Sequence, residues 1–238
     1  MTRGYIFDYG GTLDTGGQHW GQALWHAYER HQVPVTETQF REAYVHVERT
    51  LGRNPVIRPD FTFRQTLETK IQLQLAYLER NVECGMWNEI PQIADDLYER
   101  TVEQTSKSRR VLQALKDQDV PMVLVSNFYG NMPVVLREFG FDGLFLKVIE
   151  SAVVGIRKPD PRIFLLGVEA LGLKPEQVTV VGDSLDKDIA PALEAGCQAV
   201  WLRGEGWTPV SHNGDSPHCE IIDSLDELLE MIKKKYTT

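Results

Sequence analysis

Several short runs of β-forming residues are apolar along their whole length, and this restricts the folds that the chain can adopt. A strand with one face in water alternates apolar and polar residues, whereas a strand covered on both faces stays apolar throughout. The runs therefore predict a parallel sheet buried between two layers of helices. They occupy residues 5–7, 120–125, 144–149, 178–181 and 199–202.

Stretches with helical periodicity separate the later runs. They cover residues 108–118, 161–172 and 184–196, and the last ends in a glycine suited to a helix C-terminus. Strands that alternate with helices favour an α/β fold. We therefore expect a Rossmann-like core built on the parallel sheet.

The interval from residue 16 to 100 shows no convincing strand. Its periodicity predicts an all-helical domain inserted between the first and second strands. The expected core comprises residues 1–15 and 101–238, and the inserted cap comprises residues 16–100. The expected helices of the insert cover residues 18–31, 37–50, 62–81 and 89–105.

The composition excludes some classes of partner. The chain has 238 residues, a net charge of −9 and a pI of about 5.2, so nucleic acid and anionic membranes are not expected partners. The three cysteines, Cys84, Cys197 and Cys219, form no CxxC pair and are expected to be reduced thiols. No apolar stretch is long enough to span a bilayer and no signal-peptide core is visible, so we expect a cytoplasmic protein. The oligomeric state is left open.

Polar residues follow the predicted strands at the points where the strands end. Asp8 and Thr12 follow the first run, Ser126 and Asn127 the second, and Asp183 and Asp188 the fourth, while Lys158 precedes a Pro-x-Pro helix start. In open α/β sheets, ligands bind at the carboxyl ends of the strands. Each residue alone could be a turn, cap or solvated side chain, but together they predict one polar site.

The order of these motifs resembles the haloacid dehalogenase (HAD) superfamily, in particular its phosphoglycolate phosphatase and β-phosphoglucomutase-like members. The resemblance rests on DYGGTLD at 8–14, VSN ending at Asn127, KPDP from Lys158 and GDSLDKD at 182–188. It implies that Asp8 is a nucleophile that forms an aspartyl-phosphate. It also implies a Mg²⁺ site made by Asp8, the carbonyl of Gly10 and Asp183, with Asp188 in support.

The same resemblance implies a phosphate-binding role for a further set of groups. Ser126 and Lys158 would hold phosphoryl oxygens, and Lys158 would also balance the clustered carboxylates. The expected phosphate contacts are Gly10, Gly11, Thr12, Ser126, Asn127 and Lys158. The expected ligand is a small phosphorylated metabolite.

Gly10 departs from the family pattern, because phosphatases of the family have a second aspartate there that protonates the leaving group and then activates the water that hydrolyses the intermediate. His19 is the first substitute acid or base, since imidazole titrates near neutral pH, although a capping role is the simpler interpretation. Asp14 is a weaker substitute. A substrate with a good leaving group would need no acid at all.

The main hypothesis is therefore a Mg²⁺-dependent phosphatase with unconventional leaving-group chemistry. One alternative is a weak or inactive module that binds phosphate and Mg²⁺, and another is a 2-haloacid dehalogenase. Dehalogenases are expected to have a tyrosine at the Gly10 position, where this chain has Tyr9 one place earlier. A phosphonatase would need a cap lysine, and the lone candidate, Lys70, is expected to be solvated, as is the polar loop 203–220.

Overall fold

A six-stranded parallel sheet forms the centre of the computed structural model, which describes residues 3–54, 56–81, 90–208 and 219–236. The strand order is β3-β2-β1-β4-β5-β6, and all five pairings are parallel. The predicted α/β fold with a parallel sheet is thus confirmed. The strands are β1 (Gly4–Phe7), β2 (Met122–Ser126), β3 (Lys147–Glu150), β4 (Val178–Gly182), β5 (Gln198–Leu202) and β6 (Glu220–Ile222).

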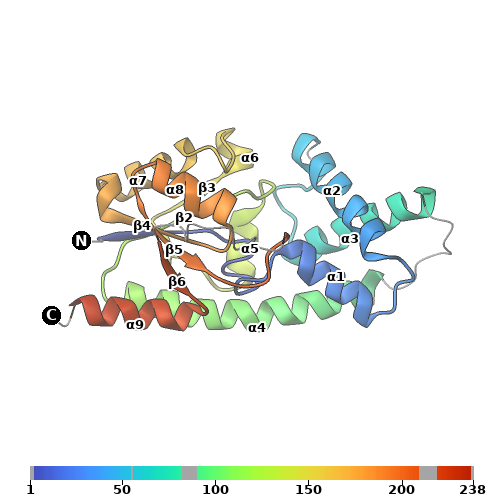
Figure 1. Ribbon diagram of the computed structural model, residues 1–238, viewed down its shortest axis with the longest axis horizontal. Coiled ribbons are helices and arrows are strands. Elements are labelled where there is room, and N and C mark those ends of the chain that lie inside the picture. Colours follow the sequence, from blue (N-terminus) through green and yellow to red (C-terminus); the bar gives the residue numbers. More distant parts are fainter. Residues whose placement is uncertain (1–2, 55, 82–89, 209–218, 237–238) are drawn as a thin grey trace.

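Helices cover both faces of the sheet (Figure 1). On one face, Ile6 and Val125 pack with residues of α7 (Arg162–Leu171) and α8 (Ala190–Glu194). On the other face lie α5 (Met132–Glu138), α9 (Leu225–Tyr236) and the second half of α4 (Ile90–Lys116). Burial on both faces explains why these strands are apolar throughout. The short α6 (Ser151–Val154) follows β3.

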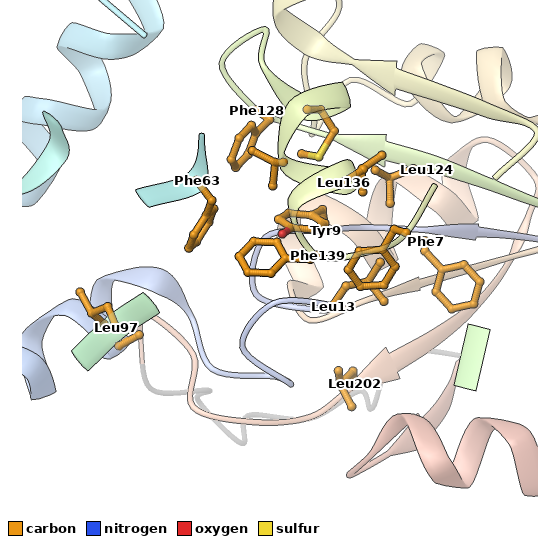
Figure 2. Close-up of a cluster of buried hydrophobic side chains, with 14 of the residues drawn as sticks. Phe7, Tyr9, Leu13, Phe63, Leu97, Leu124, Phe128, Leu136, Phe139 and Leu202 are labelled. Carbon is orange, nitrogen blue, oxygen red and sulfur yellow. The ribbon is translucent and has the colours of Figure 1, made fainter. Parts of the chain in front are cut away.

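The apolar cluster on the face covered by α4, α5 and α9 continues beyond the sheet. Figure 2 shows Phe7 and Leu124 beside Tyr9 and Phe139, with Phe63 next to them from a distant helix. All five side chains are at most 8% exposed. One apolar core therefore joins the sheet to the helices inserted after β1.

These inserted helices lie beyond the carboxyl ends of the strands in Figure 1. They are α1 (Trp20–Arg30), α2 (Glu37–Arg53), α3 (Phe63–Asn81) and the first half of α4, and we call them the helical module. Thr36 and Gln39 start α2 with a reciprocal capping box. Apolar stripes of these helices, which the periodicity of residues 16–100 predicts, belong to the same core as Phe7 and Leu124.

The structure differs from the sequence prediction at several element ends. Helices predicted over 89–105 and 108–118 are one continuous helix, α4, so the predicted boundary at residue 100 lies within a helix and the domain division stays a prediction. The predicted helix 184–196 is a π-helical turn, Leu185–Ile189, followed by α8. The strand predicted over 144–149 begins at Lys147, and β6 was not predicted.

Cys197 and Cys219 are free thiols, and Cys84 lies outside the described residues. Among the helices of the described ranges, none combines the length and the apolar character that a membrane span requires.

Candidate active site

The ends of β1, β2 and β4 bring polar side chains to one pocket. Asp8 follows β1, Ser126 ends β2 and Asp183 follows β4. All three line a cavity of about 120 Å³, together with Lys158 and Asp188. Asp8, Ser126, Lys158 and Asp188 are each at most 4% exposed. Parallel strands end at the same edge of the sheet, which is why residues so distant in sequence meet here.

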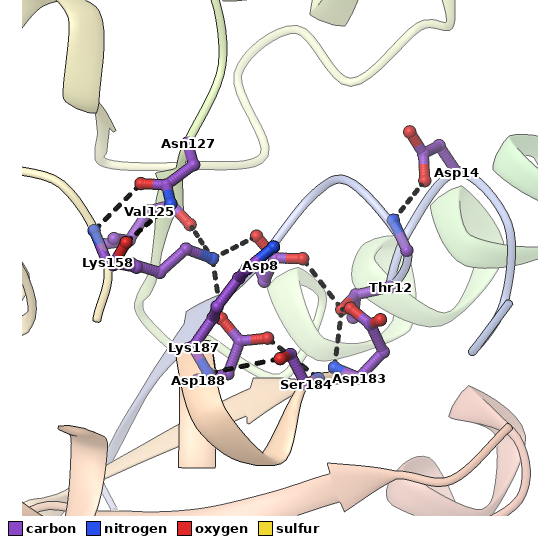
Figure 3. A network of polar contacts seen from close by, with 11 residues as sticks. Asp8, Thr12, Asp14, Val125, Asn127, Lys158, Asp183, Ser184, Lys187 and Asp188 are labelled. Atoms are coloured by element: carbon purple, nitrogen blue, oxygen red, sulfur yellow. Dashed lines mark hydrogen bonds and ion pairs between the residues drawn. The ribbon is translucent and has the colours of Figure 1, made fainter. Parts of the chain in front are cut away.

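Lys158 joins two of the carboxylates (Figure 3). Its Nζ donates to Asp8 Oδ1 and, at 2.6 Å, to Asp188 Oδ1. Burial alone would lower the pKa of Lys158, but the charges of Asp188 and Asp8 outweigh it and raise that pKa above its ordinary value. The lysine is therefore a fixed cation between two anions.

Asn127 holds Lys158 in place. Its Nδ2 donates to the carbonyl oxygen of Lys158 at 3.0 Å, and the Lys158 backbone nitrogen donates to Asn127 Oδ1 at 2.9 Å. Both ends of this amide thus contact the main chain of the lysine, although Asn127 was expected to contact phosphate.

Thr12 links the other pair of carboxylates. Its Oγ1 lies 3.0 Å from Asp8 Oδ2 and 3.1 Å from Asp183 Oδ1, and it accepts from the Asp183 backbone nitrogen at 3.1 Å. The hydroxyl has one proton, so it donates to one carboxylate at a time. Thr12 therefore organises the acids, and it is not among the residues that line the pocket.

The turn after Asp8 depends on Gly11 and Asp14. The Gly11 backbone nitrogen donates to Asp14 Oδ1 at 2.8 Å, so this N–H is engaged inside the turn rather than presented to a phosphate. Gly11 has φ +101°, and a Cβ there would lie 2.5 Å from the Asp183 carboxylate oxygens. Asp14 is fully buried, accepts from Trp20 Nε1 at 2.8 Å and lines no part of the pocket.

Three acids form a candidate cation site. Ligand oxygens of Asp8, Asp183 and Asp188 lie within 4.8 Å of one another. Burial raises the pKa of Asp8 to about 6, and the Lys158 cation opposes this rise. Burial, followed by the charges of Asp188 and Asp8, raises the pKa of Asp183 well above its ordinary value. A set of three hard oxygen donors with excess negative charge fits Mg²⁺, which would stabilise the ionised forms.

Gly10 lines the pocket without a side chain. A Cβ built there would meet Trp20 at 3.7 Å, an ordinary contact distance, and Gly10 does not have a positive φ. The position could therefore hold a larger residue, and steric crowding does not explain the absence of a carboxylate.

His19 also lines the pocket, and it caps α1. Its Nδ1 accepts from the Gly21 backbone nitrogen at 2.9 Å. Burial, with the nearby cation of Lys187, lowers the pKa of His19 to about 4. At neutral pH the ring is therefore uncharged, with its proton on Nε2.

The helical module supplies a wall of the pocket that the sequence analysis did not identify. Lys70 was expected to be solvated, and this is wrong: it is 5% exposed, and its Nζ lies 2.7 Å from Glu48 Oε1 and 3.1 Å from the Tyr129 hydroxyl. The signal was present, because Lys70 falls between Leu67 and Gln74 on the buried stripe of α3. Its partner on α2 could not be read from the sequence.

Comparison with known proteins identifies the family of the chain. The family model of haloacid dehalogenase-like hydrolases matches residues 2–196. A glyceraldehyde 3-phosphate phosphatase of Methanopyrus kandleri is 37% identical over 101 residues, which is 42% of this chain and 43% of that protein. The chain spans less than half the length of the first curated relatives that it matches.

Solved structures show the same fold over nearly the whole chain. YfnB, a HAD-type hydrolase of Bacillus subtilis bound to magnesium, is 18% identical with a TM-score of 0.58, over 98% of this chain and 99% of that one. A 2-haloacid dehalogenase of Pseudomonas syringae is 22% identical with a TM-score of 0.51 over the same shares. With the family match over residues 2–196, this chain belongs to the haloacid dehalogenase-like hydrolases.

Proposed function

We propose that the protein is a Mg²⁺-dependent phosphatase of a small phosphorylated metabolite. The supporting observation is the cluster of Asp8, Asp183 and Asp188, whose ligand oxygens lie within 4.8 Å of one another beside the buried cation of Lys158. The phosphatase relatives support the same reaction class.

In this proposal the Asp8 carboxylate attacks phosphorus and forms an aspartyl-phosphate, while the bond to the leaving oxygen breaks with its electron pair. Water then hydrolyses the aspartyl-phosphate, which releases inorganic phosphate and regenerates the Asp8 carboxylate. Asp8, Asp183, Asp188 and the Gly10 carbonyl would hold Mg²⁺, which when bound neutralises charge on the phosphoryl oxygens. Lys158 and the Ser126 hydroxyl bind the same oxygens. Asn127 fixes the main chain of Lys158, and Thr12 keeps the nucleophile and Asp183 aligned.

The leaving group determines which substrates react. Gly10 has no proton to give, and neutral His19, whose Nδ1 is engaged, acts as a hydrogen-bond donor through Nε2 rather than as a strong acid. Asp14 lines no part of the pocket. We infer that the enzyme prefers leaving groups that depart without protonation, such as the carboxylate of an acyl phosphate.

We further propose that the helical module acts as the cap of this active site. Five residues of the module line the same pocket as the acids: Trp20, Tyr44, Glu48, Phe63 and Lys70. Their mixture of aromatic and charged groups suits a small polar leaving group better than an extended apolar one.

Steady-state kinetics test the proposal. We expect acyl phosphates to be hydrolysed faster than aryl phosphates, and aryl faster than sugar phosphates, with all activity lost in EDTA or in Asp8→Asn. The matched control is Asp117→Asn, which removes an exposed carboxylate far from the pocket and should leave activity unchanged. Turnover that survives without a divalent cation, or in Asp8→Asn, would contradict the proposal.

Gly10 also favours a second function, a module that binds phosphate and Mg²⁺ with little turnover. Acyl phosphate would then leave one stable phosphoryl group on Asp8, without release of phosphate. Mass spectrometry after prolonged incubation separates the two functions. Dehalogenation has less support, because Tyr9 is fully buried, packs on Phe128 and Phe141 and does not line the pocket.

A further inference from the structure

The segment after β5 leaves the sheet and lies against the helical module. Glu205 is the first anchor: its carbonyl accepts from the His19 backbone nitrogen at 2.9 Å, and its carboxylate contacts Gln18 Nε2 at 2.6 Å and His26 Nε2 at 2.8 Å. This part of loop 203–220 was expected to be solvated. Residues 203–206 are exposed as expected, and Glu205 is in addition bonded to Gln18 and His19 at the start of α1.

Trp207 is the second and tighter anchor. Both terminal nitrogens of Arg41, on α2, donate to the Trp207 carbonyl oxygen, at 3.0 and 2.7 Å. The same guanidinium lies over the indole, with Cζ 4.1 Å from the ring centroid. One planar cation thus holds both the main chain and the side chain of Trp207, a combination that lysine could not reproduce.

Gly21 makes room for the indole. A Cβ at this position would lie 2.1 and 2.2 Å from two ring carbons of Trp207. Gly21 lies inside α1, where alanine would be more favourable for the helix. Its φ is not positive, so the backbone does not require glycine. The glycine is explained by the close approach of Trp207.

The indole also supports the wall of the pocket. The ring centroid of Trp207 lies 5.3 Å from that of His19 and 4.8 Å from that of Tyr44. Both residues line the pocket that contains Asp8 and Asp183. Trp207 itself does not line it and contacts the wall from behind.

We propose that Trp207, in the segment after β5, is a positioning residue of the hydrolase site. Its indole lies between α1 and α2, a position that we call the seat, and fixes His19 and Tyr44 against the leaving group. This rests on the proposed function. Without the indole in the seat, the rings of His19 and Tyr44 lose their support and the helical module is held less firmly over Asp8. The acids and Lys158 stay in place.

Kinetics of Trp207 variants give the first test. Trp207→Ala should raise KM roughly tenfold or more with a smaller fall in kcat, because substrate positioning rather than chemistry is lost. Trp207→Phe, which keeps an aromatic ring, should restore most of the affinity. Circular dichroism and the thermal midpoint establish that both variants fold. Unchanged KM in folded Trp207→Ala would overturn the proposal.

A pair of glycine variants tests the seat without altering Trp207. Gly21→Ala should reproduce the KM defect, although alanine favours the helix. Gly52→Ala, also in a helix of the module but with nothing within 4 Å of the added Cβ, should not. If the two variants behave alike, Trp207 does not occupy this seat in solution.

The state of His19 gives a readout that needs no turnover, so it separates this proposal from the proposed function. The groups that act on His19 are Lys187, Glu48, Lys70 and Arg41. In Trp207→Ala, water reaches the ring, and the pKa of His19 should rise from about 4 toward about 6.5. NMR titration measures this, with His19→Asn assigning the signal. An unchanged titration would overturn the positioning role even if the enzyme is active.

Discussion

Gly10 is the single residue on which the proposed leaving-group chemistry depends most. The position has room for a side chain, because the nearest atom to an added Cβ is 3.7 Å away. Gly10→Asp should therefore fold and raise kcat for sugar and alkyl phosphates, by up to about 10²–10⁴-fold. Acyl phosphates need no acid for departure of the leaving group, so their gain should be limited to the faster hydrolysis of the aspartyl-phosphate. Gly10→Asn is the matched control without a transferable proton, and an equal gain in Gly10→Asn would show that acid catalysis is not the cause.

Gly11 is constrained where Gly10 is not. In Gly11→Ala the new Cβ would lie 2.5 Å from the Asp183 carboxylate, so Asp183 must move and the cation site should be lost. The control is Gly130→Ala, since Gly130 has a similar φ of +103° but open space around it. We expect thermal stabilisation by Mg²⁺ to vanish in Gly11→Ala and to persist in Gly130→Ala. Equal responses would show that backbone strain, rather than the contact with Asp183, is responsible.

His19 gives a pH dependence whose direction is fixed by its environment. The folded pKa of about 4 is below the ordinary value of 6.5, so the unfolded chain binds this proton first and the contribution of His19 to stability falls as the pH drops from 6.5 to 4. The loss is up to about 3 kcal/mol. The raised pKa values of Asp8, Asp14 and Asp183 contribute with the opposite sign. His19→Asn can still cap α1. The wild type should therefore lose unfolding free energy relative to this variant as the pH drops over the window, which removes the acids from the comparison. If the variant shows the same slope as the wild type, other groups cause the pH dependence.

The sequence identified the strand-end residues but assigned some roles differently from the contacts seen. Topology alone predicts that four of these residues lie close together, because parallel strands end at one edge of the sheet. They are Asp8, Ser126, Lys158 and Asp183. Thr12 and Asn127 hold other side chains or the main chain, and this depends on rotamers and turn geometry that a pattern does not encode. Backbone spacing predicts where a residue lies, but not which neighbour its last atoms contact.

At the scale of elements, α4 was the main feature that periodicity could not resolve. Its buried residues Ile93 and Leu97 lie in the half that belongs to the helical module, and Val111 and Leu115 lie in the half that covers the sheet. The change in packing partner along the helix was interpreted from the sequence as a break between two helices. No glycine or proline interrupts the helix from residue 92 to 116. Continuity therefore follows from tertiary packing on two partners rather than from a local signal.

Ser108 fastens α4 to the turn that carries the site. Its Oγ donates to the Leu13 carbonyl oxygen at 2.7 Å, and the side chain is fully buried. Ser108→Ala should cost about 1 kcal/mol or more of unfolding free energy, because a buried carbonyl loses its partner. Ser106→Ala, exposed on the same helix, isolates the gain in helix propensity and should be neutral or slightly stabilising. Equal effects in urea unfolding would show that the bond to Leu13 contributes nothing.

At the scale of the whole molecule, the fold places three acids and one lysine close together in a protein whose net charge is already −9. Burial, followed by repulsion from Asp188 and Asp8, raises the pKa of Asp183, so the folded state should be strained electrostatically until a cation binds. Binding to the folded state alone stabilises it by about 2.7 kcal/mol at a Mg²⁺ concentration near 100 Kd. For a chain of this size that corresponds to a rise of roughly 5–10 °C in Tm.

At pH 7.5, Asp183→Asn should separate the destabilisation caused by repulsion among the acids from the stabilisation caused by bound Mg²⁺. In EDTA the variant should melt at or above the temperature of the wild type, because one repelling carboxylate is gone while the amide keeps the shape of the side chain. In Mg²⁺ the wild type should gain stability and the variant should not, so the order of the two Tm values reverses. Differential scanning calorimetry of both proteins, with Asp117→Asn as the control for a lost surface charge, measures this directly. A variant less stable than the wild type in EDTA would mean that Asp183 is held mainly by Thr12 and the backbone, and that the cluster is a structural network rather than a cation site.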